Sequence, residues 1–176
     1  MPDWAVHAIV PLFALLLVSQ KENTKYILYL LPLALIPDLD HFAFMHRALL
    51  HNMFIPLIFL GAFVIYRDQR TRFLLITGAV YTASHVILDM FNGGVALFYP
   101  FTSNMFFINA ELIYRQGFSW VLNWGVAPYS DNWILANGYV INSIGAASII
   151  FLLMAGMCLY YRNRSNNDNN EVLNEA

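Results

Sequence analysis

The chain has 176 residues, of which 59% are hydrophobic, 16% aromatic and 11% charged. An average soluble domain is about half apolar and about a quarter charged, so this composition excludes an ordinary soluble domain and indicates a membrane protein. The formal net charge of −2 offers no basic face, and we expect no nucleic-acid partner. The single cysteine, Cys158, cannot form an internal disulfide.

Five apolar runs separated by polar turns predict transmembrane helices. They cover residues 4–19, 26–36, 48–66, 73–91 and 139–161. Pro37 should end the second run, because proline donates no amide hydrogen and disfavours helix in the residue before it. The start of the chain has no basic region typical of a signal peptide, so we expect the first run to remain in the mature protein.

Residues 95–136 are rich in Phe, Tyr and Trp but are interrupted by Pro100, Gly117, Gly125 and Pro128. This pattern favours an interfacial or re-entrant segment over a clean span. The expected fold class is therefore all-α, a polytopic membrane helix bundle of about five transmembrane helices plus this segment. Residues 1–161 would form one domain with the metal site, and the Asn-rich residues 162–176 a disordered cytoplasmic tail.

The basic residues predict the orientation in the membrane, because cytoplasmic loops carry an excess of Lys and Arg. In the five-helix arrangement seven basic residues fall on one side: Lys21, Lys25, Arg67, Arg70, Arg72, Arg162 and Arg164. Only Arg47 and Arg115 fall on the other side. We therefore expect a cytoplasmic C-terminus, an outer N-terminus and all four Trp on the outer half.

Two ionisable groups stand out against the apolar background. Residues 37–52 read P-D-L-D-H-F-A-F-M-H-R-A-L-L-H-N, and residues 85–89 read H-V-I-L-D. With His7, these two groups contain all five histidines of the chain, and the predicted orientation puts them near the outer membrane face. Ionisable side chains beside membrane spans are costly, so their presence indicates a function.

The same blocks, followed by N-G-G at residues 92–94 and by Pro100 and Phe101, resemble the YdjM-like family of membrane-bound, metal-dependent hydrolases. That family is described as LexA-binding and inner-membrane-associated, so the resemblance implies a LexA-type repressor as a partner. The resemblance covers about the first hundred residues in order. It departs at Ala48, Leu50 and Asn52, where the family usually has Gly, Thr and Ser.

Imidazole nitrogens and carboxylate oxygens both bind divalent metals, and a cation would make their crowding in a membrane tolerable. The candidate metal ligands are His7, Asp38, Asp40, His41, His51, His85 and Asp89. The absence of a nearby thiolate indicates a catalytic site, with zinc favoured over manganese or iron. Because a single tetrahedral ion uses only four ligands, we expect one or two ions per chain, the second bridged by an Asp.

The candidate catalytic residues are Asp40, His46 and Arg47. Of His46 and His51, one could be a ligand and the other a general acid or base. Arg47 could clamp a phosphate or carboxylate, or simply extend to the head groups. Structural explanations also exist for the others: His7 as a core histidine, Asp38 as a helix cap, and His85 with Asp89 as a hydrogen-bonded pair between helices.

The function we expect is a membrane-bound metal-dependent hydrolase that cleaves a phosphoester or ester of a lipid-like substrate at the extracytoplasmic face, with membrane lipid and a small-molecule or lipid substrate as partners. Two alternatives remain open. A transporter or a proton or metal relay also concentrates His and Asp in membrane helices, although no acidic group or imidazole lies in the cytoplasmic half of the expected spans. The other is a non-catalytic metal-binding or LexA-interacting membrane adaptor.

Overall fold

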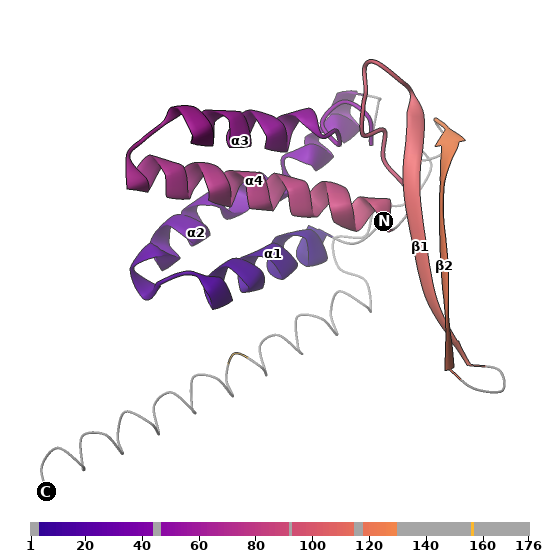
Figure 1. Ribbon diagram of the computed structural model, residues 1–176, viewed down its shortest axis with the longest axis horizontal. Helices are drawn as coiled ribbons and strands as arrows, with labels where there is room; N and C mark the ends of the chain where they lie inside the picture. Colours follow the sequence, from indigo (N-terminus) through magenta and orange to yellow (C-terminus); the bar gives the residue numbers. More distant parts are fainter. Residues whose placement is uncertain (1–3, 44–46, 92, 115–117, 130–155, 157–176) are drawn as a thin grey trace, which may run out of the picture.

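The structure is a computed structural model that describes residues 4–43, 47–91, 93–114, 118–129 and 156 (Figure 1). Its elements follow in the order α1 (Trp4–Val18), η1 (Lys21–Asn23), α2 (Thr24–Leu30), η2 (Leu31–Leu35), η3 (Pro37–Ala43), α3 (Phe54–Ile65), α4 (Gln69–Met90), β1 (Asn104–Tyr114) and β2 (Phe118–Pro128). The three η elements are 3-10 helices.

The expected all-α bundle of five spans is wrong. In the part of the chain that the structure describes, there are four α-helices and a two-stranded antiparallel sheet. Only α4, with 22 residues, is long and apolar enough to cross a membrane, while α1 and α3 are shorter apolar helices. The expected last span at 139–161 lies outside the described residues apart from Gly156, and so does the expected tail at 162–176.

Prolines account for two of the shortened helices. Pro32 has no amide hydrogen for an α-helical bond, and after Leu30 the chain of α2 tightens into the 3-10 helix η2. Pro56 lies in the first turn of α3, where proline is tolerated. A longer helix would have forced the Pro56 ring against the carbonyl of Asn52, so α3 begins at Phe54 instead of residue 48.

The longest helix begins earlier than the hydropathy indicated. α4 starts at Gln69 instead of residue 73, because the Asp68 side chain accepts a 2.8 Å hydrogen bond from the amide of Thr71. This is the usual N-cap arrangement, which satisfies an amide that has no partner inside the helix. A polar turn that reads as a loop is therefore the first turn of α4.

The expected interfacial or re-entrant segment is instead a β-hairpin over most of its length. β1 and β2 pair antiparallel, with Phe106 opposite Val126, Ile108 opposite Trp124 and Leu112 opposite Trp120. Aromatic and β-branched residues favour strands, and their cross-strand contacts stabilise the pairing. The glycine in β2 that suggested a break, Gly125, lies beneath the ring of Phe107.

Two apolar clusters hold the elements together. Ile27, Ala34 and Tyr81 form the first, where the Tyr81 hydroxyl donates a 2.9 Å hydrogen bond to the Ile27 carbonyl. The second contains Val86 of α4 and Val95 and Leu97 of the following loop, with Phe106 of β1 packed against it. The hairpin consequently runs across the end of the helices and extends beyond them (Figure 1).

Candidate metal centre

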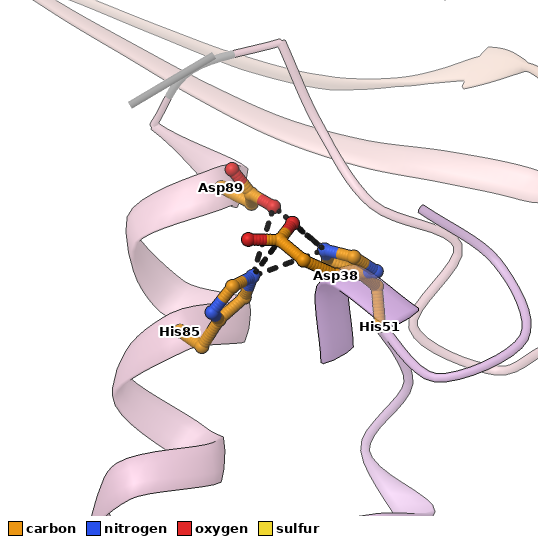
Figure 2. Close-up of side chains that lie close together, drawn as sticks. All are labelled: Asp38, His51, His85 and Asp89. Carbon is orange, nitrogen blue, oxygen red and sulfur yellow. Dashed lines mark hydrogen bonds and ion pairs between the residues drawn. The ribbon is translucent and has the colours of Figure 1, made fainter. Parts of the chain in front are cut away.

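The polar residues singled out from the sequence meet at the C-terminal end of α4. His85 and Asp89 lie one turn apart on this helix, η3 supplies Asp38, and the loop before α3 supplies His51 (Figure 2). All four side chains are buried. Each offers one ligand atom, and these atoms lie within 4.8 Å of one another, as the ligands of a single metal ion do.

His51 and His85 point their Nε2 atoms at the centre of this group. The two Nε2 atoms are 3.1 Å apart. Asp89 Oδ2 lies 2.9 Å from His51 Nε2 and 3.6 Å from His85 Nε2. Asp38 Oδ1 lies 3.6 and 3.5 Å from the same two nitrogens. Two imidazoles and two carboxylates therefore converge from three segments of the chain.

The protonation of His85 follows from its outer nitrogen. His85 Nδ1 lies 2.6 Å from the carbonyl oxygen of Ala34 in η2. A carbonyl can only accept, so Nδ1 carries the hydrogen, and in the neutral form of the ring the lone pair lies at Nε2. The 3-10 helix that interrupts the second apolar run thus orients a ligand on α4.

Asp40 does the same for His51. Its Oδ2 lies 2.8 Å from His51 Nδ1 and also accepts a 3.2 Å hydrogen bond from the amide of Leu50. The His51 ring donates through Nδ1, so in the neutral form of the ring the lone pair lies at Nε2. A carboxylate bonded to the outer nitrogen of a histidine is the usual support of a metal-binding imidazole. Two lone pairs that face each other at 3.1 Å repel, unless a positive charge lies with them.

The carboxylates also lack donors. Asp89 Oδ2 and both oxygens of Asp38 are buried and accept no hydrogen bond from the described residues. Buried acceptors without donors are costly. Among the described buried side chains, with the imidazoles neutral, the carboxylates of Asp38, Asp40 and Asp89 exceed the guanidinium of Arg47 by two negative charges. A divalent cation would supply both the missing contacts and the missing charge, so the residues present fit a metal ion.

Two further residues hold the other oxygen of Asp89. Arg47 is fully buried; its Nη2 lies 3.3 Å from Asp89 Oδ1 and its Nη1 donates a 3.2 Å hydrogen bond to the Gly94 carbonyl. Arg47 has a left-handed φ of 66°, which is uncommon outside glycine. His7 Nε2 lies 3.4 Å from the same Oδ1, and its ring stacks on His85 with centroids 3.8 Å apart.

The electrostatics of the group favour a positive charge at its centre. Burial alone would raise the pKa of Asp38, but the imidazoles of His51 and His85 beside it hold that pKa well below its ordinary value. Burial alone would lower the pKa of His51, but the carboxylates of Asp38, Asp40 and Asp89 outweigh it and raise that pKa well above the ordinary value. The carboxylates therefore attract a proton or a metal ion to His51 Nε2.

The structure brings most of the candidate residues together, some at the centre of the group and others around it. Asp38, His51, His85 and Asp89 form the central group, while Asp40, Arg47 and His7 surround it. His46 and the side chain of His41 lie outside the described residues. The roles of the Ala34 and Gly94 carbonyls could not be predicted from the sequence, because every residue type carries this group.

The turn before α3 is held by the side chain that follows His51. Asn52, where the family usually has Ser, accepts a 3.0 Å hydrogen bond from the Phe54 amide and donates a 2.7 Å bond to the Leu49 carbonyl. Asn and Ser side chains both make such turns with the nearby backbone. The Asn52 side chain therefore stabilises the turn that presents His51 to the group.

Comparisons with known proteins agree with the membrane character of the chain. A family model described as YdjM inner membrane protein matches residues 2–165. No curated protein and no solved structure gives a match. The matched range contains the whole metal-ligand group and the hairpin.

Proposed function

The chain belongs to the YdjM inner membrane protein family, and from this premise we propose that it is a metal-dependent hydrolase that cleaves a phosphoester or ester of a lipid-like substrate. The observation that carries the proposal is the buried group of Asp38, His51, His85 and Asp89, whose ligand atoms lie within 4.8 Å of one another. Structural zinc sites rely on cysteine, whereas mixed His and carboxylate ligands are typical of catalytic sites.

These four residues would hold the ion, with zinc favoured and manganese or iron as alternatives. A divalent ion there would supply Lewis acidity and would lower the pKa of a water molecule. A second ion stays a prediction, since the other oxygen of Asp89 faces His7 and Arg47. The four-residue group by itself supports one ion per chain.

The surrounding residues take supporting roles in this proposal. Asp40 fixes the ring of His51 through Nδ1, so it is a positioning residue. Arg47 orients Asp89 and anchors Gly94, and its action as a phosphate clamp stays a prediction. His7 Nδ1 is buried without a hydrogen-bond partner in the described part of the chain, which makes His7 a candidate to move a proton beside the ion. His46 as a general acid or base also stays a prediction.

An extracytoplasmic site is supported by the basic residues at the opposite end of the helices. Lys25 of α2 and Arg70 of α4 both lie over the Tyr26 ring, 5.0 and 4.9 Å from its centroid. The basic turns after α1 and before α4 therefore meet at the end of α4 far from Asp89. By the positive-inside rule this end would be cytoplasmic, and the metal group would face the other side of the membrane, where a lipid substrate can approach.

The position of the buried polar groups favours a hydrolase over a transporter. Among the described residues, every buried Asp, His and Arg belongs to the metal group or to its surroundings at one end of α4. The buried polar side chains farther along α4 are Thr77 and Thr82, and neither carries charge. A relay across the membrane would need titratable groups along the span. A LexA-type partner stays a prediction.

Elemental analysis of the purified full-length protein in detergent tests the proposal. We expect at least one divalent ion per chain, and turnover in a panel of lipid phosphoesters and esters that chelator removes and added metal restores. His85→Ala should lose both the ion and the activity, and Ser84→Ala, its neighbour on α4, should keep both. Absence of stoichiometric metal, with chelation changing nothing, would sink the proposal. A bound ion without turnover would leave a non-catalytic metal site.

A further inference from the structure

The hairpin carries an apolar surface that the helices cover only at one end. Side chains in a strand alternate between two faces, so residues two apart share one face. With the register of β1 and β2, one face carries an apolar set between Asn104 at its start and the hairpin turn: Phe106, Ile108, Ala110, Trp120, Leu122, Trp124 and Val126. We call this set the apolar hairpin face. Trp120 and Trp124 are 74% and 68% exposed.

The opposite face of the hairpin has a different chemistry. Its described side chains include the exposed Asn109, Ser119 and Asn123, together with the buried Met105, the half-buried Phe107 and the exposed Val121. The two faces therefore divide into an apolar and a partly polar side, as expected for a sheet with water on one side and an apolar phase on the other. Isolated hairpins of two strands are marginal in water, so an apolar partner would also help to stabilise this one.

The apolar hairpin face looks toward the helices. Phe106 packs against the cluster that contains Val86 of α4. By strand alternation, Trp120, Leu122 and Trp124 lie on the same face as Phe106 but farther toward the hairpin turn. The turn end of the hairpin extends past the helices (Figure 1). The hairpin crosses the end of α4, the one candidate membrane span among the described residues. A bilayer around α4 would consequently meet this face.

We propose that the apolar hairpin face is a lipid-docking surface that lies on the bilayer interface at the metal-site end of α4. Tryptophan is enriched at this depth, because its ring is apolar and its N–H can still reach a polar partner. Membership of an inner membrane protein family makes lipid the occupant that the chain meets. The surface is independent of the metal group, so either proposal can fail without the other.

Depth-dependent quenching of tryptophan fluorescence tests this surface. The full-length chain with Trp4→Phe, Trp120→Phe and Trp133→Phe keeps Trp124 as its one tryptophan. It is reconstituted in vesicles of phosphatidylethanolamine and phosphatidylglycerol that contain lipids brominated near the head groups. We expect Trp124 to lose most of its emission to these lipids and little to aqueous iodide. A second single-tryptophan variant, which retains Trp120 instead of Trp124, should show the same quenching. Two independent variants keep the test valid if one of them misfolds.

A control on the opposite face sharpens the test. Asn123→Trp combined with Trp124→Phe in the same background moves the reporter by one residue and therefore to the other side of β2. Its emission should be quenched by iodide and much less by brominated lipid. Strong iodide quenching of Trp124 would overturn the proposal. Protection of Trp124 from both quenchers would overturn it too, because a second copy or residues 130–161 would then cover the face.

Discussion

The metal group and the hairpin invert the usual distribution of side chains in opposite ways. Around His85 and Asp89, charged and polar groups are buried. On the hairpin, Trp120 and Trp124 are exposed. In water each arrangement costs free energy, since buried charge needs a partner and exposed apolar surface is better removed from solvent. In our two proposals, each region is completed by something outside the chain: a cation for the first and a lipid phase for the second.

We expect the largest effect from Asp89→Asn, which changes the buried metal group. The change removes a candidate ligand and the ion pair with Arg47, and breaking a buried pair costs about 3–5 kcal/mol. We expect loss of the bound metal and a large fall in the midpoint of thermal unfolding in detergent. Ser84→Ala serves as the control. A variant that keeps both metal and midpoint would show that Asp89 is dispensable in the cluster.

A smaller effect should follow Asp40→Ala, which leaves the four candidate ligands in place. Loss of the carboxylate behind a metal-binding histidine typically weakens metal affinity by about 10–100-fold. We expect a weaker dissociation constant in a metal titration of the detergent-solubilised protein, with binding retained. Asp40→Asn should recover part of the affinity, because an amide oxygen can still accept from His51 Nδ1. The same change at the exposed neighbour, Leu39→Ala, should leave the affinity unaltered.

The smallest effect tests the connection between the two regions. Gly94 has a φ of +95°, and a Cβ there would lie 2.9 Å from the Phe106 carbonyl oxygen. Gly94→Ala should therefore destabilise the protein by about 1 kcal/mol or more. The strain falls on the loop whose Val95 bridges to Phe106 of β1, and whose Gly94 carbonyl accepts from Arg47.

Gly61→Ala in α3 is the matched control, since a Cβ at this position meets nothing within 4 Å. Alanine is favoured over glycine inside a helix by about 1 kcal/mol, so this variant should unfold at a higher temperature. The same substitution is thus expected to act in opposite directions at the two sites. Equal stability of the two variants would mean that the loop after α4 adapts freely and does not couple the hairpin to the helices.

The spacing within residues 85–89 was sufficient to predict that two members of the metal group lie on the same face of a helix. His85 and Asp89 are four residues apart, and a helix puts such residues on one face. The roles of Asp38 and Asp40 could not be predicted in this way. They are two residues apart, and the structure turns Asp38 toward the centre and Asp40 toward the outer nitrogen of His51. That division depends on where the loop before α3 places His51.

Hydropathy predicted apolar segments well and their length or type poorly. The first run became α1 almost unchanged because its apolar residues favour a helix, although Pro11 lies inside it. Residues 104–128 became a hairpin because strand pairing satisfies the backbone of each strand through the other. The hydropathy pattern of one strand does not show which other strand will pair with it. Two runs were shortened at Pro32 and Pro56, whose effect on the helix depends on the position of each ring within a turn.

The membrane character of the chain and the cost of burying its ionisable side chains could be inferred from the sequence, because composition and the free energy of burial belong to each residue separately. It took the fold to bring the Nε2 atoms of His51 and His85 within 3.1 Å of each other and to lay an apolar hairpin face across the end of α4. The histidine pair depends on contacts among residues 34, 40, 51 and 85, and the hairpin face depends on the pairing of residues 106 and 126. Contacts between residues distant in the sequence exist only once the chain has folded.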